Sequence, residues 1–251
     1  LAKLRPCELM FADNKDCPCT VRGGAATAFI LVDYCSRAKF KVDVSSKRNN
    51  GLAFQSIAVS NGVHKLPYKC RVYTDGCGSM QYVQQMSNKL GIDHAYTPPH
   101  QQSLNEAEKV ADQMWAAARA HILHSGAPDV LFSKAVDYAM YVDLRTATTA
   151  SRYWKTPLEI IQGVAPSISK LHRFYTRAFV TAPRSKRSFL ETQGLTANRA
   201  EAGRFIGFQS PMSSTYAVML SNNRLVHSID VTFNDSNATV RDTDTLPAPE
   251  A

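Results

Sequence analysis

The sequence predicts an α/β protein in which helices cover both faces of a mixed sheet, followed by a smaller β-rich part. Up to residue 144, strand-like apolar runs alternate with segments of helical periodicity. Beyond residue 200, only short β-like runs remain, separated by Gly and Ser-Asn-Asn. With 44% hydrophobic and 20% charged residues, the chain of 251 residues carries enough apolar side chains to form a core without disulfides.

The elements of the first part follow from periodicity and from stop signals. Gly91 and Gly126 stand where helices are expected to end, and Pro98 and Pro99 hold their loop out of a helix. The expected strands are 7–12, 29–32, 39–44, 70–74 and 92–94, of which 29–44 form a hairpin. The expected helices are 48–60, 80–90, 103–124 and 132–144.

The character of the chain changes near Pro166. Residues 170–187 carry six Lys or Arg and no acid, and they are expected to form a basic linker, either solvated or, as Phe174, Tyr175 and Phe179 favour, partly packed. The runs 203–208, 215–220 and 225–233 predict a small barrel, and the acidic, proline-containing tail predicts disorder. The expected domains are therefore 1–165, 166–235 with the linker and barrel, and 236–251 as the tail.

Bulk properties exclude several classes. No stretch approaches about 18–20 consecutive apolar residues, so no membrane span or membrane partner is expected. All six cysteines lie before residue 78 without zinc-ligand spacing, which favours free, mostly buried thiols in a reducing compartment. His94, His100, His121 and His124 could suggest zinc, but His121 and His124 lie three apart on an expected helix without companion cysteines, which favours a surface or cation-assisting role. The net charge of +8 agrees with a polyanionic partner.

Three acidic positions stand where one fold would bring them together. Asp13 and Asp75 each end an expected strand, and either Glu106 or Glu108 opens the long helix. Carboxylates from two strand ends and a helix start can converge and hold a divalent metal, as in phosphoryl transfer on nucleic acid. Asp33 and Asp43 belong to the hairpin and are expected to be structural or solvated, and Asp16 is expected to lie in a loop beyond the first strand.

Motifs in a fixed order resemble the integrase region of a copia-type LTR retrotransposon polyprotein, over about residues 5 to 235. PCELMFAD (6–13) resembles the first catalytic strand, and FILVDYCSR (29–37) is similar to the hairpin F-x-D-D-Y-S-R of the family. The remaining matches are Asp75 as second aspartate, GIDH (91–94) with YTP (96–98), KTPLE (155–159) with Gly163 and Pro166, RFIGF (204–208), Tyr216 and DVTF (230–233).

The resemblance implies a ribonuclease H-like catalytic core over 1–165 and a small SH3-like β domain after it. It implies a DDE-type polynucleotidyl transferase that processes 3′ ends and transfers strands by a two-metal mechanism. Asp13, Asp75 and Glu108 would be both the catalytic residues and the ligands of two Mg²⁺, with Mn²⁺ as a substitute. Zinc is not expected here, because the upstream zinc module of the family lies outside this stretch.

The partners that the resemblance implies are the element's DNA ends, the target DNA and further copies of the chain. It also implies a nuclear location, or a cytoplasmic virus-like particle before nuclear entry. Lacking an initiator Met, the chain is expected to be a piece of a longer polypeptide. Phosphate contacts are expected from one set of basic residues: Lys109, Arg119, Lys170, Arg173, Arg177, Arg184, Lys186 and Arg187.

Two departures from the family leave alternatives open. DGCGSM (75–80) stands where the family continues N-G-G-E-F, and QSLNEAEK (102–109) replaces Q-N-G-V-x-E-R. The alternative function is a catalytically decayed integrase fold that serves only as a DNA-binding or assembly module. A ribonuclease H-like nuclease with the same fold and metals is a second alternative.

Either glutamate of the long helix could face the aspartates, but not both. Residues two apart on a helix point about 200° away from one another. Ser103 and Glu106 have the spacing of a capping box, and so do Asn105 and Glu108. Glu106 continues into the apolar stripe of the helix, whereas Glu108 continues along its polar side. We therefore predict Glu108 as the third carboxylate.

Overall fold

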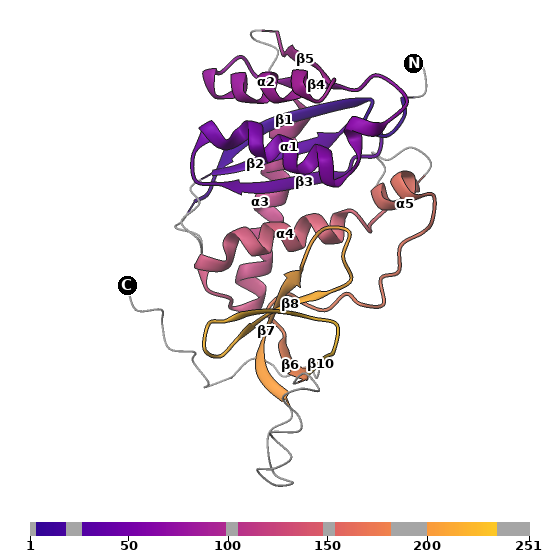
Figure 1. The fold of residues 1–251 in the computed structure, drawn as a ribbon. Coiled ribbons are helices and arrows are strands. Elements are labelled where there is room, and N and C mark those ends of the chain that lie inside the picture. Colours follow the sequence, from indigo (N-terminus) through magenta and orange to yellow (C-terminus); the bar gives the residue numbers. More distant parts are fainter. Residues whose placement is uncertain (1–3, 19–26, 99–104, 148–153, 182–199, 235–251) are drawn as a thin grey trace. The chain divides into compact units, whose positions relative to one another are not determined.

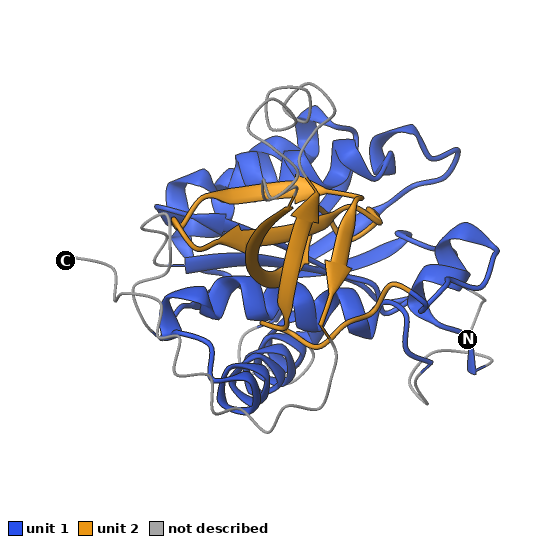
Figure 2. Ribbon diagram, turned by 90° about the horizontal axis from the view of Figure 1, so that it is seen from below, with its two compact units in different colours: residues 1–169 blue, residues 170–251 orange. Residues whose placement is uncertain are grey.

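The computed structural model describes residues 4–18, 27–98, 105–147, 154–181 and 200–234 (Figure 1). The chain divides into two compact units, which comprise residues 1–169 and 170–251 (Figure 2). The tail over 236–251, expected to be disordered, lies outside the described residues.

Unit 1 is built on a five-stranded mixed sheet with the order β3-β2-β1-β4-β5. Its strands are β1 (Leu9–Asp16), β2 (Thr27–Asp33), β3 (Lys39–Val44), β4 (Arg71–Thr74) and β5 (Asp93–Tyr96). The first three form an antiparallel meander, and β4 and β5 continue it in parallel from β1. This order and these directions are those of the ribonuclease H-like fold, which confirms the predicted fold class.

Helices cover both faces of this sheet. They are α1 (Asn50–Ser60), α2 (Gln81–Lys89), α3 (Glu106–Ser125), α4 (Phe132–Asp143) and the short α5 (Pro157–Gln162). The side chains of Met10, Phe29 and Leu31 join those of Phe54 and Val83 in one core, so α1 and α2 lie on that face. Helix α3 packs on β1 and β2, and α4 packs on β3 and on α3.

Burial of β2 on both faces explains its continuous apolar sequence. All seven residues of β2 are buried. Phe29 and Leu31 belong to the core under α1 and α2, so Ala28, Ile30 and Val32 turn to the other face by the two-residue period of a strand. A central strand between two helical layers needs apolar side chains at every position.

Local sequence signals set the helix ends. Asn105 caps α3, because its side chain accepts the backbone N–H of Ala107. Gly126 ends α3 with φ 65°, and Gly163 ends α5 with φ 75°, a conformation that costs glycine little. Asn105 is thus the N-cap of α3, and Ser103, from the other predicted capping pair, lies outside the described residues.

The first strand is longer than predicted. Strand β1 continues three residues past Asp13, so Asp13 lies within the strand and Asp16 is its last residue rather than part of a loop. The apolar run ends at Ala12, but the backbone pairing with β2 continues to Asp16↔Thr27. The hairpin partner, and not hydrophobicity, therefore sets this boundary.

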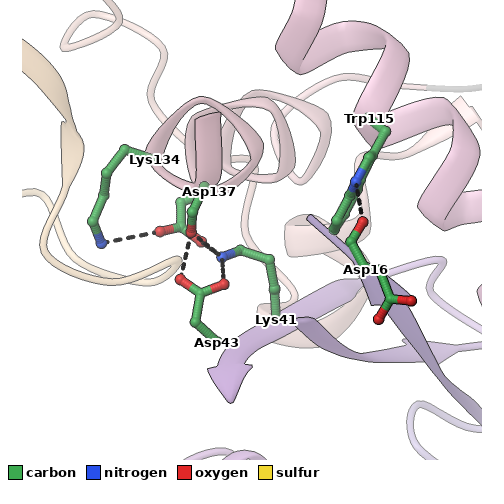
Figure 3. A network of polar contacts seen from close by, with 7 residues as sticks. Asp16, Lys41, Asp43, Trp115, Lys134 and Asp137 are labelled. Atoms are coloured by element: carbon green, nitrogen blue, oxygen red, sulfur yellow. Dashed lines mark hydrogen bonds and ion pairs between the residues drawn. The ribbon is translucent and has the colours of Figure 1, made fainter. Parts of the chain in front are cut away.

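A buried ionic network joins β3 to α4 (Figure 3). Lys41 Nζ lies 2.6 Å from Asp43 Oδ1 and 3.0 Å from Asp137 Oδ1, and its side chain is only 2% exposed. Ser133 donates to Asp43, and Lys134 pairs with Asp137 at 3.2 Å. Asp43 was expected to be either structural or solvated, and this network makes it structural.

Unit 2 is a five-stranded antiparallel sheet with the order β10-β6-β7-β8-β9. Its strands are β6 (Arg177–Thr181), β7 (Ala200–Phe208), β8 (Tyr216–Leu220), β9 (Leu225–Ser228) and β10 (Val231–Phe233). The first strand pairs with the last, and the others form a meander, which is the strand order of an SH3-like domain. Phe205 packs edge-on against Tyr216 and Phe233 in its core.

The structure adds detail to two expectations for unit 2. Within the stretch predicted as a basic linker, β6 is partly packed, with Ala178 and Val180 buried between exposed or half-buried neighbours, in agreement with the packed alternative. The single run predicted over 225–233 is two strands. They separate at a turn in which the Asp230 N–H donates to Ser228 Oγ at 3.1 Å.

Other bulk expectations can be compared with the described residues. No described helix has both the length and the apolar character needed to cross a bilayer. The five described cysteines are free thiols, of which Cys70 is buried, Cys77 is exposed and the rest are half-buried.

Candidate functional site

The parallel pairing of β1 with β4 places Asp13 beside Asp75. Ala12 and Thr74 are Cα partners in this pair, and each aspartate follows its partnered residue by one position. Neighbouring strands lie about 4.8 Å apart, so the two backbones present their carboxylates side by side. Asp13 shares its face of β1 with Phe11 and Lys15, since side chains on a strand alternate.

The environment of Asp13 opposes its ionisation. Partial burial is the main cause that raises the pKa of Asp13, to about 6. A hydrogen bond from the Asn14 N–H at 2.7 Å acts in the opposite direction, and so does the charge of Lys15. The negative charges of Asp75 and Glu108 raise this pKa further. The charges of Asp75, at the end of β4, and of Glu108, in the first turn of α3, therefore both act on Asp13 in β1.

The two glutamates of α3 have different surroundings. Glu106 Oε2 accepts a hydrogen bond from Arg37 Nη1 at 2.9 Å, and both side chains are about three-quarters buried, at 24% and 23% exposed. Lys109 Nζ lies 3.7 Å from the other oxygen of Glu106. Glu108 is exposed, and its charge acts on Asp13. The Glu106 carboxylate is thus engaged by two cations, and Glu108 is the glutamate that acts on the aspartate.

Two contacts near the end of β1 hold α3 against the sheet. The indole N–H of Trp115 donates to the carbonyl oxygen of Asp16 at 3.3 Å (Figure 3). One turn earlier, Lys15 Nζ pairs with Asp112 Oδ1 at 2.7 Å. Together with the Arg37–Glu106 pair, they fix the helix at both ends of its first three turns.

The hairpin turn between β2 and β3 is organised by Asp33, which is 1% exposed. Its carboxylate accepts the backbone N–H groups of Cys7 at 2.9 Å and Ser36 at 3.0 Å, and also the hydroxyl of Ser36. Burial raises the pKa of Asp33, and the bonds from Ser36 oppose that shift. Asp33 was expected to be either structural or solvated, and these contacts make it structural.

The end of β4 and the residues after it are held by hydrogen bonds that involve Thr74, Asp75 and His94 of β5. Thr74 Oγ1 donates to the carbonyl oxygen of Asp75 at 3.1 Å and lies 3.0 Å from His94 Nε2. The N–H of Cys77 donates to Asp75 Oδ1 at 3.4 Å. His94 is half-buried and contacts Thr74, so it is not a fully exposed residue. The parallel register that brings β5 beside β4 produces this contact.

The donor set suits a hard divalent cation, although the described residues contain no group of three His, Cys, Asp or Glu side chains placed to hold one. Carboxylate oxygens are the ligands that Mg²⁺ prefers. Burial is the main cause of the raised pKa of Asp13 and the charges of Asp75 and Glu108 add to it, so a divalent cation beside these carboxylates would offset part of that cost. In chemistry and charge, the residues present therefore fit a divalent metal.

The predicted phosphate-binding residues lie in both units. In unit 1, Lys109 and Arg119 are exposed on α3. In unit 2, Lys170, Arg173 and Arg177 are exposed, and Arg177 lies over the ring of Phe179 at 5.5 Å. The other three predicted residues, Arg184, Lys186 and Arg187, lie outside the described part of the chain.

Sequence reasoning missed two residues of this site. Lys15 shares its strand face with Asp13, a two-residue spacing that was visible in the sequence. Arg37 ends the hairpin motif FILVDYCSR, but the motif does not indicate its partner Glu106, which lies 69 positions away. Only the tertiary structure brings the hairpin turn to the helix start.

No protein-family model matches this chain, and no curated protein matches it. Among solved structures, the HTLV-2 integrase catalytic core domain in complex with magnesium is similar in its trimeric form, at 16% identity and a TM-score of 0.47. That similarity covers 63% of this chain and 99% of that one. The dimeric form of the same domain has 16% identity and a TM-score of 0.47, over 64% of this chain and 99% of that one.

A simian T-cell lymphotropic virus intasome in complex with the PP2A regulatory subunit B56 gamma is also similar. The identity is 12% and the TM-score 0.46, over 92% of this chain and 83% of that one. The ribonuclease H-like arrangement of unit 1 follows from its own strand order and directions. Its similarity to retroviral integrase catalytic cores is one of fold.

Proposed function

We propose that this chain is the integrase region of a copia-type LTR retrotransposon, which processes the 3′ ends of element DNA and joins them to target DNA. One observation carries the proposal: the parallel register of β1 and β4 places Asp13 beside Asp75, and the charge of Glu108 at the start of α3 also acts on Asp13. Convergence of three carboxylates from β1, β4 and α3 is costly for a metal-free fold and useful for phosphoryl transfer.

Asp13, Asp75 and Glu108 would hold Mg²⁺, or Mn²⁺ in its place, at two positions. When bound, such ions activate the attacking oxygen and neutralise charge on the leaving oxygen of an in-line displacement. The chain itself supplies the anionic donors and their orientation. The Asn14 N–H fixes one oxygen of Asp13, and the Cys77 N–H holds one oxygen of Asp75.

The chain would also position its DNA. Exposed Lys109 and Arg119 lie on the same helix as Glu108, where they can contact phosphates near the reacting bond. In unit 2, Lys170, Arg173 and Arg177, with Arg184, Lys186 and Arg187, would add sequence-independent contacts whose affinity falls with salt. Copies of the chain would assemble to hold two element ends, in the nucleus or in a virus-like particle before nuclear entry.

The test is strand transfer of a labelled duplex that carries the element's own terminal sequence, with Mg²⁺ or Mn²⁺. The protein is the full chain, alone and joined to the zinc-binding module that precedes it in the family. Asp75→Asn and Glu108→Gln are expected to abolish joined product. Glu106→Gln is expected to retain it, because the glutamine carbonyl still accepts from Arg37.

The other outcomes separate the alternatives. Loss of product with Glu106→Gln, and not with Glu108→Gln, would reverse the assignment of the third carboxylate. Metal-dependent cleavage without joining would identify a ribonuclease H-like nuclease. Salt-sensitive DNA binding without cleavage or joining would identify a decayed integrase fold that acts as a binding or assembly module.

A further inference from the structure

The turn between β2 and β3 contacts the start of α3 through one partly buried ion pair. Arg37 Nη1 donates to Glu106 Oε2 at 2.9 Å, and Glu106 is the first residue of the helix. The two side chains are 23% and 24% exposed, which separates this pair from the largely exposed pairs elsewhere in unit 1, such as Arg71–Asp93 at 52% and 47%. A charged hydrogen bond that is shielded from water is stronger and more directional than an exposed one.

Contacts within the hairpin turn fix the position of Arg37. Its backbone has φ 64°, an uncommon conformation for a residue with a side chain. Its N–H donates to the carbonyl oxygen of Asp33 at 2.9 Å. The buried Asp33 carboxylate fixes the rest of the turn, and Arg37 Cζ lies 4.6 Å from the centre of the Tyr34 ring. The turn thus presents the guanidinium in one defined position.

Fixing Glu106 also fixes the rotation of α3 about its own axis. Residues two apart on a helix differ by about 200° in direction, so the position of Glu106 determines where Glu108 points. Asn105 caps the same turn through the N–H of Ala107. The cap holds the backbone of the first turn, and the Arg37 contact holds its orientation relative to β1.

We propose that Arg37 is a positioning residue: through Glu106, it orients the first turn of α3 so that the Glu108 carboxylate faces Asp13 and Asp75. This inference rests on the proposed function, because it assigns the pair to the metal-binding carboxylates of the same site. Arg37 itself contacts no reacting group. It acts by setting the geometry of a ligand, as residues behind the ligands do in metal sites.

The test uses the full chain and two measurements that do not depend on catalysis. The first is the dissociation constant of Mn²⁺, measured by electron paramagnetic resonance. The second is hydrogen exchange of the backbone amides of Ala107 and Glu108 in the metal-free protein. Arg37→Ala and Glu106→Ala are each expected to weaken Mn²⁺ binding by roughly tenfold, with faster exchange at the helix start. The double variant with Arg37→Ala and Glu106→Ala is expected to bind Mn²⁺ no more weakly than either single variant, because both changes remove the same contact.

Three further variants sharpen the result. Arg37→Lys and Glu106→Gln each keep a hydrogen bond across the pair and are expected to stay within about threefold of the unchanged chain. Arg71→Ala removes an exposed pair between β4 and β5 and is expected to change neither measurement. Strand transfer should follow Mn²⁺ affinity across the series.

Two results overturn the inference and leave the proposed function standing. In the first, Arg37→Ala changes neither Mn²⁺ affinity nor amide exchange. In the second, Arg37→Ala speeds amide exchange without any loss of Mn²⁺ affinity, because the pair would then stabilise the helix start without orienting Glu108. An unchanged chain that binds no Mn²⁺ is a different result, since it contradicts the proposed function itself and the inference with it.

Discussion

The Nε2 atom of His94 lies 3.0 Å from Thr74 Oγ1, and that hydroxyl donates its hydrogen to the carbonyl oxygen of Asp75 at 3.1 Å. The donor or acceptor role of Nε2 in this contact depends on the tautomer of the His94 ring. Its Nδ1 is buried and has no partner among the described residues. Burial favours the neutral form of His94, which contacts the residue that precedes Asp75 in the chain.

Acidification should destabilise the chain through His94. Burial lowers the pKa of His94 from its ordinary value of 6.5. The unfolded chain therefore binds the proton first, and stability is lost as the pH falls below about 6.5. His94→Phe keeps an aromatic ring beside Tyr96 and should remove part of this pH dependence, as measured by urea unfolding between pH 7 and pH 5. His124→Phe, at an exposed position, should retain the full dependence, and an equal effect of both variants would contradict this assignment.

The pH dependence due to Asp13 has the opposite sign. Its pKa is raised from 3.8 to about 6, so the folded state binds the proton more tightly and stability falls as the pH rises through that interval. At pH 7 the cost is on the order of 2–3 kcal/mol. Asp13→Asn should stabilise the metal-free chain by up to that amount in urea unfolding at pH 7, whereas Asp93→Asn, at an exposed position, should not.

Added Mg²⁺ gives the matching control. It should stabilise the unchanged chain at pH 7 through binding to the folded state, and it should stabilise Asp13→Asn far less. Equal stabilisation of both by Mg²⁺ would show that Asp13 is not a ligand.

The network around Lys41 should be the most sensitive ionic site of unit 1 (Figure 3). Burial alone would lower the pKa of Lys41, but the charges of Asp137 and Asp43 outweigh it and raise that pKa. Lys41→Met removes the cation and leaves two partly buried carboxylates without it, at a cost of about 3–5 kcal/mol in unfolding free energy. Lys134→Ala, whose side chain is 40% exposed, should cost less than about 1 kcal/mol. Similar losses in the two variants would mean that Asp137 is solvated in the absence of Lys41.

The crossing of α1 and α2 requires a glycine at position 51. A Cβ at Gly51 would lie 2.5 Å from the carbonyl oxygen of Tyr82, which is backbone and cannot rotate away. Gly51→Ala should destabilise the chain by about 1–3 kcal/mol in thermal or urea unfolding, although alanine is the better helix former. Gly78→Ala, where a Cβ would meet nothing within 4 Å, should be nearly neutral. A stabilised Gly51→Ala would show that the two helices can separate at low cost.

Much of the fold could be predicted because local patterns agree with it. The apolar run of β2, the alternation of β3 and the periodicity of α3 and α4 each reflect a face that must be buried. The end of β1 could not be predicted, because pairing with β2 extends it through polar residues. Strand β6 was missed for a related reason: its arginine and threonine positions suggest a linker, and only the sheet buries Ala178 and Val180 between them.

By itself, the sequence determined which residues could do chemistry and the order of the elements that carry them. Asp13 and Asp75 follow apolar runs, and Asn105 is an N-cap signal at the start of the helix that carries both glutamates. Tertiary structure decided how those side chains meet. The parallel register placed Asp75 beside Asp13, and Arg37, from a turn 69 positions away, engaged Glu106 and left Glu108 to act on Asp13. Such contacts depend on long-range packing, for which neighbouring residues in a sequence carry no periodic signal.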